Sequence, residues 1–220
     1  MRTYYNRFAG QSLERLAALS DGIFAVAMTL LVLDLHVPMS KAIPDLPLWA
    51  NGALKSEEYL WDALGGLSRS LLTYFMSFLT LGIFWVGQQT QFNQFARSNR
   101  HLTWIHLAFL LAVSLMPFST GLLAAFITFR LALVVYWLNI LFLGVMLFVS
   151  LRYAQHAELL KDETTAEMRS ASERRIVIAQ ALYALGALLC IINTYVSIAF
   201  IVLVQLNYAI APRLRPLDRI

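Results

Sequence analysis

The sequence predicts an all-α integral membrane protein with six transmembrane helices in a single domain, residues 1–220. Apolar residues make up 59% of the chain and charged residues only 14%, whereas soluble domains are about half apolar and a quarter charged. The apolar residues are gathered in long uncharged runs, and a helix needs about 20 such residues to cross the hydrocarbon of a bilayer. Multiple membrane crossings follow from these two observations.

The first expected span covers residues 16–35, and its centre, Gly22 to Leu33, contains no charge. On a helical wheel at about 100° per residue, Val26, Leu30 and Leu33 fall on one stripe within about 60°. Asp21 lies about 140° from Val26 on the same wheel, so a stripe that faced a pore would turn Asp21 toward neighbouring helices. The wheel alone leaves open whether the stripe packs against other helices, faces lipid or lines a pore.

Three further spans are expected at residues 71–92, 102–123 and 131–151, where charged residues mark the ends of apolar runs. An uncharged run of 37 residues then extends from Ile176 to Pro212. One helix of that length would measure about 55 Å, too long for the hydrocarbon. Asn193 and Thr194 in its middle favour a turn between spans 176–192 and 195–211. The alternative is one long tilted helix, giving five spans.

The distribution of the 17 basic residues favours six spans, because cytoplasmic segments are enriched in Lys and Arg. Six spans place most of the basic residues on the side of both termini: Arg2, Arg7, Arg15, Arg97, Arg100, Arg152, Lys161, Arg169, Arg174, Arg175, Arg213, Arg215 and Arg219. The opposite side keeps only Lys41, Lys55, Arg69 and Arg130. Both termini are therefore expected in the cytoplasm. On that opposite side, the linker from Val37 to Ser68 is expected to hold a short interfacial helix.

The first span carries a motif that resembles a known family. Arg15 is followed by Leu19-Ser20-Asp21-Gly22 and then FAVAMTLLVLDL. This pattern is similar to the signature helix of the endolysosomal transmembrane potassium-channel family, in its single-repeat bacterial branch. The family pattern is an Arg followed by Phe-Ser-Asp, and Leu19 stands here in place of the Phe. Because the chain holds one such helix, the resemblance implies a homotetramer whose first helices surround a central pore.

The second and third spans extend the resemblance. FWVGQQ, residues 84–89, is similar to the family's second-helix pattern, with Gln88 and Gln89 where that pattern has two histidines. LTWIHLAFLLAVSLMPF, residues 102–118, is similar to its third-helix pattern, with His106 near the position of an Asn. The resemblance implies a polar network formed by Arg15, Ser20, Asp21, Trp85, Gln88 and His106. For His106, a simple packing role is the alternative.

The resemblance implies a leak-type, potassium-permeable cation channel in the plasma membrane of a prokaryote. Its constriction would be formed by Val26, Leu30 and Leu33, with Thr29 beside it, and these are the residues of the apolar stripe. The chain lacks the Thr-Val-Gly-Tyr-Gly carbonyl filter of other potassium channels, so an apolar constriction would take its place. The expected partners are the lipid bilayer and identical subunits; potassium is the permeant species, and no cofactor or metal is expected.

Other function classes find less support in the residues. The chain contains no phosphate-binding loop, no His-Glu-x-x-His motif and no usable Ser/His/Asp set, so an enzyme is not expected. The net charge of +4 is explained by cytoplasmic arginines, which leaves no reason to expect nucleic-acid binding. Two alternatives remain: a secondary transporter with polar groups at mid-membrane depth, and a non-conducting membrane assembly protein.

Overall fold

The computed structural model of the protein describes residues 12–37, 49 and 53–210, and its regular secondary structure there is helical apart from one isolated bridge, Phe95 to Leu160. The helices are α2 (Leu13–Leu30), α3 (Ala53–Gly66), α4 (Ser68–Gln94), α5 (Arg100–Ala125), α6 (Arg130–His156), α7 (Ala166–Leu188) and α8 (Thr194–Ile210). Short 3₁₀ turns extend α2 over Leu31–Asp34 and α7 over Leu189–Ile191. The all-α class predicted from the sequence is confirmed.

Five helical segments are long and apolar enough to cross a membrane, so the chain is a multi-pass membrane protein. They are Leu13–Asp34, Ser68–Gln94, Arg100–Ala125, Arg130–His156 and Ala166–Ile191. The expected spans at 71–92, 102–123 and 131–151 each fall within one of them. Helix α8 is equally apolar but has only 17 residues.

The alternative of one long helix after Ile176 is wrong, because the chain turns between α7 and α8. Asn193 lies in this turn, and its side-chain Oδ1 accepts a hydrogen bond from the backbone N–H of Tyr195 (2.7 Å). Such a contact satisfies a free N–H at the start of α8. The two helices then pack closely at Gly186, where a Cβ would come within 2.8 Å of Ile201 Cγ1.

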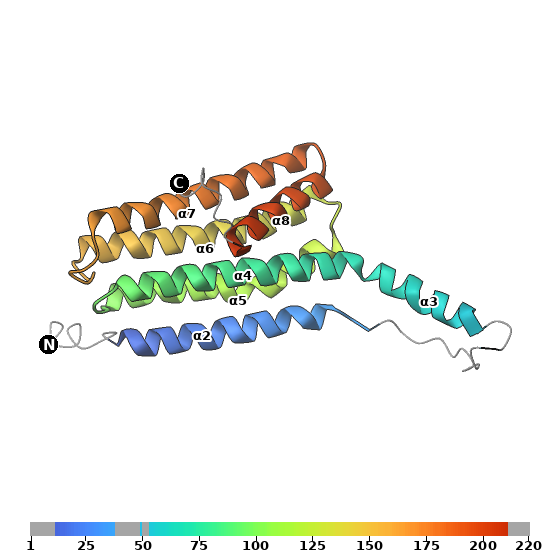
Figure 1. Ribbon diagram of the computed structural model, residues 1–220, viewed down its shortest axis with the longest axis horizontal. Coiled ribbons are helices and arrows are strands. Elements are labelled where there is room, and N and C mark those ends of the chain that lie inside the picture. Colours follow the sequence, from blue (N-terminus) through green and yellow to red (C-terminus); the bar gives the residue numbers. More distant parts are fainter. Residues whose placement is uncertain (1–11, 38–48, 50–52, 211–220) are drawn as a thin grey trace.

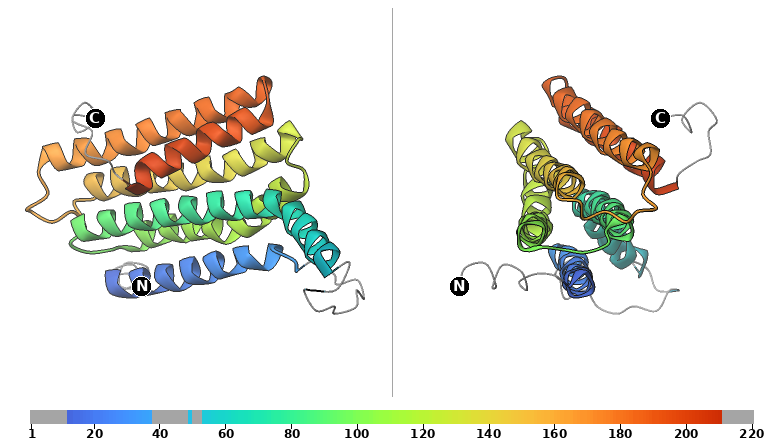
Figure 2. Two further views of the ribbon diagram at one scale, coloured as in Figure 1. Left: turned by 45° about the vertical axis from the view of Figure 1, so that its right-hand side comes forward. Right: turned by 90° about the vertical axis from the view of Figure 1, so that its left-hand side faces the viewer.

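The long helices lie side by side in one bundle, with α2 along one edge and α7 along the opposite edge (Figures 1 and 2). Helix α2 packs against α4 and α5, while α7 packs against α6 and α8. Helix α3 extends away from the bundle, at the end opposite the start of α2 (Figure 1). It lies in the linker for which a short helix was predicted, and Trp61 on it is exposed.

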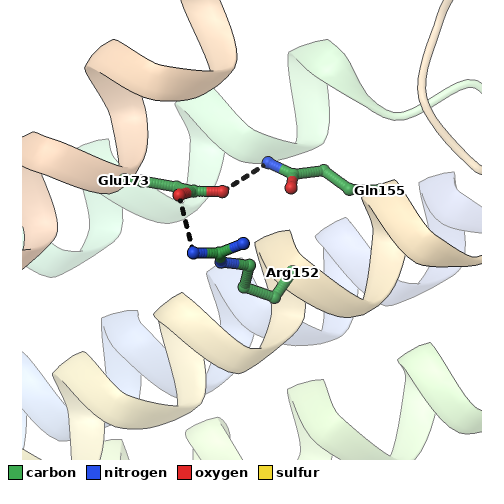
Figure 3. Close-up of polar contacts among 3 residues, drawn as sticks. All are labelled: Arg152, Gln155 and Glu173. Carbon is green, nitrogen blue, oxygen red and sulfur yellow. Dashed lines mark hydrogen bonds and ion pairs between the residues drawn. The ribbon is translucent and has the colours of Figure 1, made fainter.

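The loops at the end of the bundle where α2 begins are held together by specific contacts. Ala96 N donates to Leu159 O (2.8 Å), and Lys161 N donates to Gln94 O (2.9 Å). Nearby, the Glu173 carboxylate of α7 accepts from Gln155 Nε2 (2.8 Å) and forms an ion pair with Arg152 (3.2 Å), both on α6 (Figure 3). The two backbone bonds fix the α4–α5 loop against the α6–α7 loop, and the Glu173 contacts join α7 to α6.

The first span differs from the expectation in one respect, since a single α-helix was expected over residues 16–35. The α-helix ends at Leu30, and a 3₁₀ turn follows over Leu31–Asp34. In a 3₁₀ turn, residues three apart eclipse each other. Leu33 therefore lies directly above Leu30 rather than about 60° away, and both stay on the same stripe.

Several sequence predictions concern residues outside the described ranges. These are the basic residues Arg2, Arg7, Lys41, Arg213, Arg215 and Arg219, and residue 211 at the end of the last expected span. The positions of both termini relative to a membrane stay predictions for the same reason.

Candidate functional site

Helix α2 has two sharply different faces within the subunit. The stripe that the wheel predicts is exposed: Val26 is 57% exposed, Leu30 42% and Leu33 66%. Phe24 and Leu31, on the other face, are 2% and 0% exposed. Residues 30 and 31 thus have opposite environments although they are neighbours in the chain. A row of exposed leucines and valines indicates a surface that contacts another subunit, lipid or a ligand.

Val26 and Leu30 of the exposed stripe lie in one wall of an open groove between α2 and α5, with a volume of about 660 Å³. The other wall comes from α5. Most of the lining side chains are apolar: Leu19, Val26 and Leu30 on α2, and Leu107, Leu110 and Leu111 on α5. Thr29 is also exposed beside the stripe, but its hydroxyl donates to Val26 O (2.8 Å). The hydroxyl is therefore partly satisfied by its own helix.

Asp21 faces α4 rather than the groove. Its Oδ1 accepts one hydrogen bond from Trp85 Nε1 (2.8 Å) and another from Gln89 Nε2 (2.9 Å). Hydrogen bonds to a charged acceptor are stronger than those between neutral groups. The carboxylate nevertheless remains exposed in the single subunit, because the contact lies at the rim of the α2–α4 interface.

Arg15 was expected in the same network and as a possible partner of Asp21. Within the described residues, no ion pair joins the two, and the Arg15 side chain is exposed. Its backbone N–H donates to Ser12 Oγ at the start of α2 (3.2 Å). The physical reason is geometric, since six residues along a helix separate the two side chains by about 9 Å and 120°.

Ser20, Gln88 and His106 meet in the buried centre of the α2–α4–α5 contact. Gln88 Nε2 donates to Ser20 Oγ (3.2 Å) and lies 3.4 Å from His106 Nδ1. His106 Nε2 lies 3.0 Å from Ser150 Oγ on α6. With the Gln88 amide in this orientation, the hydrogen-bond network assigns Nδ1 of His106 as the acceptor from Gln88 and Nε2 as the donor to Ser150 Oγ.

His106 also packs against aromatic rings, so the polar and the packing interpretations both apply. Its ring centroid lies 4.8 Å from that of Phe92 and 6.2 Å from that of Phe95. All three side chains are almost fully buried. Gln88 Oε1 has no hydrogen-bond partner, but the contacts of Gln88 Nε2 and of both His106 nitrogens join α2, α4, α5 and α6. Buried polar contacts of this kind fix the relative positions of the helices that carry them. Here they fix the rotation of α2, with the apolar stripe turned outward.

Two members of this arrangement were not singled out from the sequence as network residues. Gln89 binds Asp21. The sequence could have identified it as a network residue, because Gln88 and Gln89 occupy the two positions where the family pattern has histidines. Ser150 binds His106 from α6, outside the part of the chain that carries the resemblance. No sequence pattern distinguishes Ser150 from other serines.

Comparison with known proteins gives a consistent match for the first half of the chain. The model of the family described as "Endosomal/lysosomal potassium channel TMEM175" matches residues 15–117. Potassium channel B446_29190 of Streptomyces collinus is 39% identical over 113 residues, which is 51% of this chain and 48% of that protein. Potassium channel Cha6605_3372 of Chamaesiphon minutus is 33% identical over 113 residues, covering 51% and 50%.

More distant relatives carry a different name. The Bos taurus protein named endosomal/lysosomal proton channel TMEM175 is 30% identical over 118 residues, covering 52% of this chain and 23% of that protein. The chain spans about half the length of the bacterial relatives that it matches. The residues matched by the family model include nearly all of α2, the whole of α4, and Ser20, Gln88 and His106 of the buried network.

A solved structure extends the likeness to nearly the whole chain. It is the crystal structure of a lysosomal potassium-selective channel TMEM175 homolog from Chamaesiphon minutus, with a TM-score of 0.74 and 24% sequence identity. The alignment covers 91% of this chain and 98% of that one. At this identity the likeness concerns the fold, and it includes the helices beyond residue 117.

Proposed function

We propose that this chain belongs to the TMEM175 family, whose model matches residues 15–117, and that it forms a leak-type, potassium-permeable cation channel. The family is one of ion channels rather than enzymes. One observation within the chain carries the proposal. The buried network around Gln88 fixes α2 while its apolar stripe stays uncovered by the rest of the subunit.

The proposed channel is a homotetramer in the plasma membrane. Each subunit is one six-span domain, with α8 as the sixth span and both termini in the cytoplasm. The α2 helices surround the central axis, and Val26, Leu30 and Leu33 of the subunits form stacked apolar rings. Support comes from the groove between α2 and α5, which a neighbouring subunit would help to close.

The proposed constriction works without a ring of carbonyl oxygens. Narrow apolar rings gate a pore by losing their water. Leu30 is expected to be the narrowest point, because Val26 is smaller and Leu33 lies in the 3₁₀ turn near the end of the helix. A weakly coordinating constriction admits best the ion that gives up its hydration most easily. Potassium is less tightly hydrated than sodium, so modest potassium selectivity is expected.

Single-channel recording of the purified protein in planar bilayers tests this function. With potassium on one side, sodium on the other and equal pH on both, we expect unitary currents that reverse at a potential favouring potassium. Saturable flux without unitary currents would indicate a transporter, and the absence of both would indicate an assembly protein. A pH step at constant potassium then shows whether protons also carry current, as the names of the vertebrate relatives suggest.

Labelling of introduced cysteines tests the proposed topology. Position 56 lies in α3 and position 165 just before α7, at opposite ends of the bundle (Figure 1). Ser56→Cys should react with a membrane-impermeant thiol reagent added outside intact cells, while Thr165→Cys should react only after the cells are opened. The native Cys190 is buried and serves as the background. Reaction of both positions from one side would contradict the six-span arrangement.

A further inference from the structure

A second cavity lies away from α2, between α4, α6, α7 and α8, and has a volume of about 90 Å³. It has room for several water molecules or for a small group of a few heavy atoms. Helix α8 has 17 residues and stops short of the end that α7 reaches, as Figure 1 shows. The cavity lies where α8 ends, with Tyr208 on α8 and Arg175 on α7 in its wall.

The cavity is lined mainly by apolar side chains, but it gathers buried polar atoms that lack partners. Among the described residues, seven buried side-chain polar atoms have no hydrogen-bond partner, and three of these belong to the cavity wall. They are Gln91 Oε1, Gln180 Oε1 and the Tyr183 hydroxyl. Such groups cost free energy unless a ligand or water satisfies them.

Gln91 and Tyr183 are well fixed for binding. Gln91 is 2% exposed, and its Nε2 already donates to Leu147 O (2.9 Å), which leaves Oε1 as a free acceptor. Tyr183 is 1% exposed. A ligand that fits must therefore bring at least one hydroxyl or another hydrogen-bond donor into an otherwise apolar space.

Arg175 gives the cavity a positive charge. Its guanidinium lies over the Tyr208 ring, 5.8 Å from the ring centroid, and no carboxylate pairs with it among the described residues. Arg152 differs, because Glu173 neutralises it (Figure 3). Arg175 is also the last charge before the uncharged run that begins at Ile176, so it stands where headgroups meet hydrocarbon.

We propose that this cavity binds the headgroup of an anionic phospholipid that carries hydroxyl groups, such as phosphatidylglycerol. The phosphate lies at the exposed Arg175, and only the hydroxyl-bearing end of the headgroup enters the cavity, where it forms hydrogen bonds with Gln91 Oε1, Gln180 Oε1 and the Tyr183 hydroxyl. Charge argues against the chain's own C-terminal residues as the occupant, since residues 211–220 contain three arginines and one aspartate. An anionic lipid complements Arg175, and basic residues at a membrane surface attract such lipids.

Thermal unfolding of the purified full-length protein in non-ionic detergent tests the proposal. Because a ligand that binds only the folded state raises the apparent Tm, phosphatidylglycerol should raise it by several degrees and phosphatidylcholine by much less. Arg175→Gln should weaken phosphatidylglycerol binding about tenfold, the usual effect of losing a charge-assisted contact. Arg174→Gln, an exposed neighbour with the same charge change, should leave the lipid response intact.

Tyr183→Phe gives a second, independent readout. Its hydroxyl has no protein partner, so the variant should be as stable as the native protein or more stable without lipid, yet lose part of the lipid-induced shift. The matched control is Tyr136→Phe, whose hydroxyl lies 3.2 Å from both Ser77 Oγ and Thr80 Oγ1. Tyr136→Phe should lower the Tm by the same amount with and without lipid.

Three outcomes would overturn the proposal. Equal shifts from phosphatidylcholine and phosphatidylglycerol would show that charge is not recognised. Equal responses of Arg175→Gln and Arg174→Gln would show that the lipid binds elsewhere. A full shift from soluble glycerol 3-phosphate would identify a free phosphate ester, not a lipid, as the ligand. None of these experiments measures ionic current, so a result that overturned lipid binding would not contradict the proposed channel function.

Discussion

The two faces of α2 share one helix but have opposite roles. One face turns Ser20, Phe24 and Leu31 into the subunit, where packing and hydrogen bonds hold them. The other face presents Val26, Leu30 and Leu33, which are as apolar as the buried residues yet remain exposed. Hydrophobicity therefore does not separate the two faces, because both are apolar. The difference lies in the polar contacts of the inner face, which fix how the helix is turned.

The largest expected effect comes from Leu31→Asn on the inner face. Leu31 is fully buried, and the substitution removes packed carbon atoms while burying an amide that has no partner. Together these changes should cost about 3–5 kcal/mol of stability. We expect little or no folded protein in size-exclusion chromatography. Leu30→Asn, one residue away on the outer face, should give the native yield of folded protein. If both variants lost folded protein to the same extent, the two faces of α2 would not differ in their importance for folding.

The next effect concerns the contact between α2 and α4. Asp21→Ala leaves the N–H groups of Trp85 and Gln89 without their acceptor, which should cost about 1–3 kcal/mol. The expected result is poor assembly with unchanged ion preference in the protein that does assemble. Asp21→Asn keeps an acceptor oxygen and should assemble better. A stable Asp21→Ala tetramer with altered selectivity would mean that Asp21 itself faces the pore.

A smaller effect is expected at the centre of the buried network. Gln88→Met keeps the side-chain volume but removes the bridge between Ser20 and His106. Ser20 Oγ still donates to Leu16 O, and His106 still meets Ser150, so the loss should be only about 1–2 kcal/mol. The apparent Tm measures it. His106→Asn is a useful comparison, and a rise in Tm for Gln88→Met would show that the network does not stabilise the subunit.

The sequence was sufficient for the helical class, for most helix positions and for the turn at Asn193, because charges and polar residues interrupt long apolar runs there. The family resemblance implied one network of Ser20, Asp21, Trp85, Gln88 and His106. The structure divides these residues into two sets of contacts, one between Asp21 and Trp85 and the other among Ser20, Gln88 and His106. Arg15 stands apart from them. Local sequence patterns do not predict features that depend on tertiary packing. Here these are the 3₁₀ turn after Leu30, the Ser150 contact and the cavity beside Arg175.

The central claim is that the outer face of α2 lines the conduction path, and cysteine accessibility tests it most directly. Leu30→Cys and Leu31→Cys place the same small thiol on adjacent residues of opposite exposure. During single-channel recording, a cationic thiol reagent should reduce the Leu30→Cys current by more than about half, because the added group fills an apolar constriction. It should leave the Leu31→Cys current unchanged. Block of Leu31→Cys with no effect on Leu30→Cys would contradict the proposed orientation of α2.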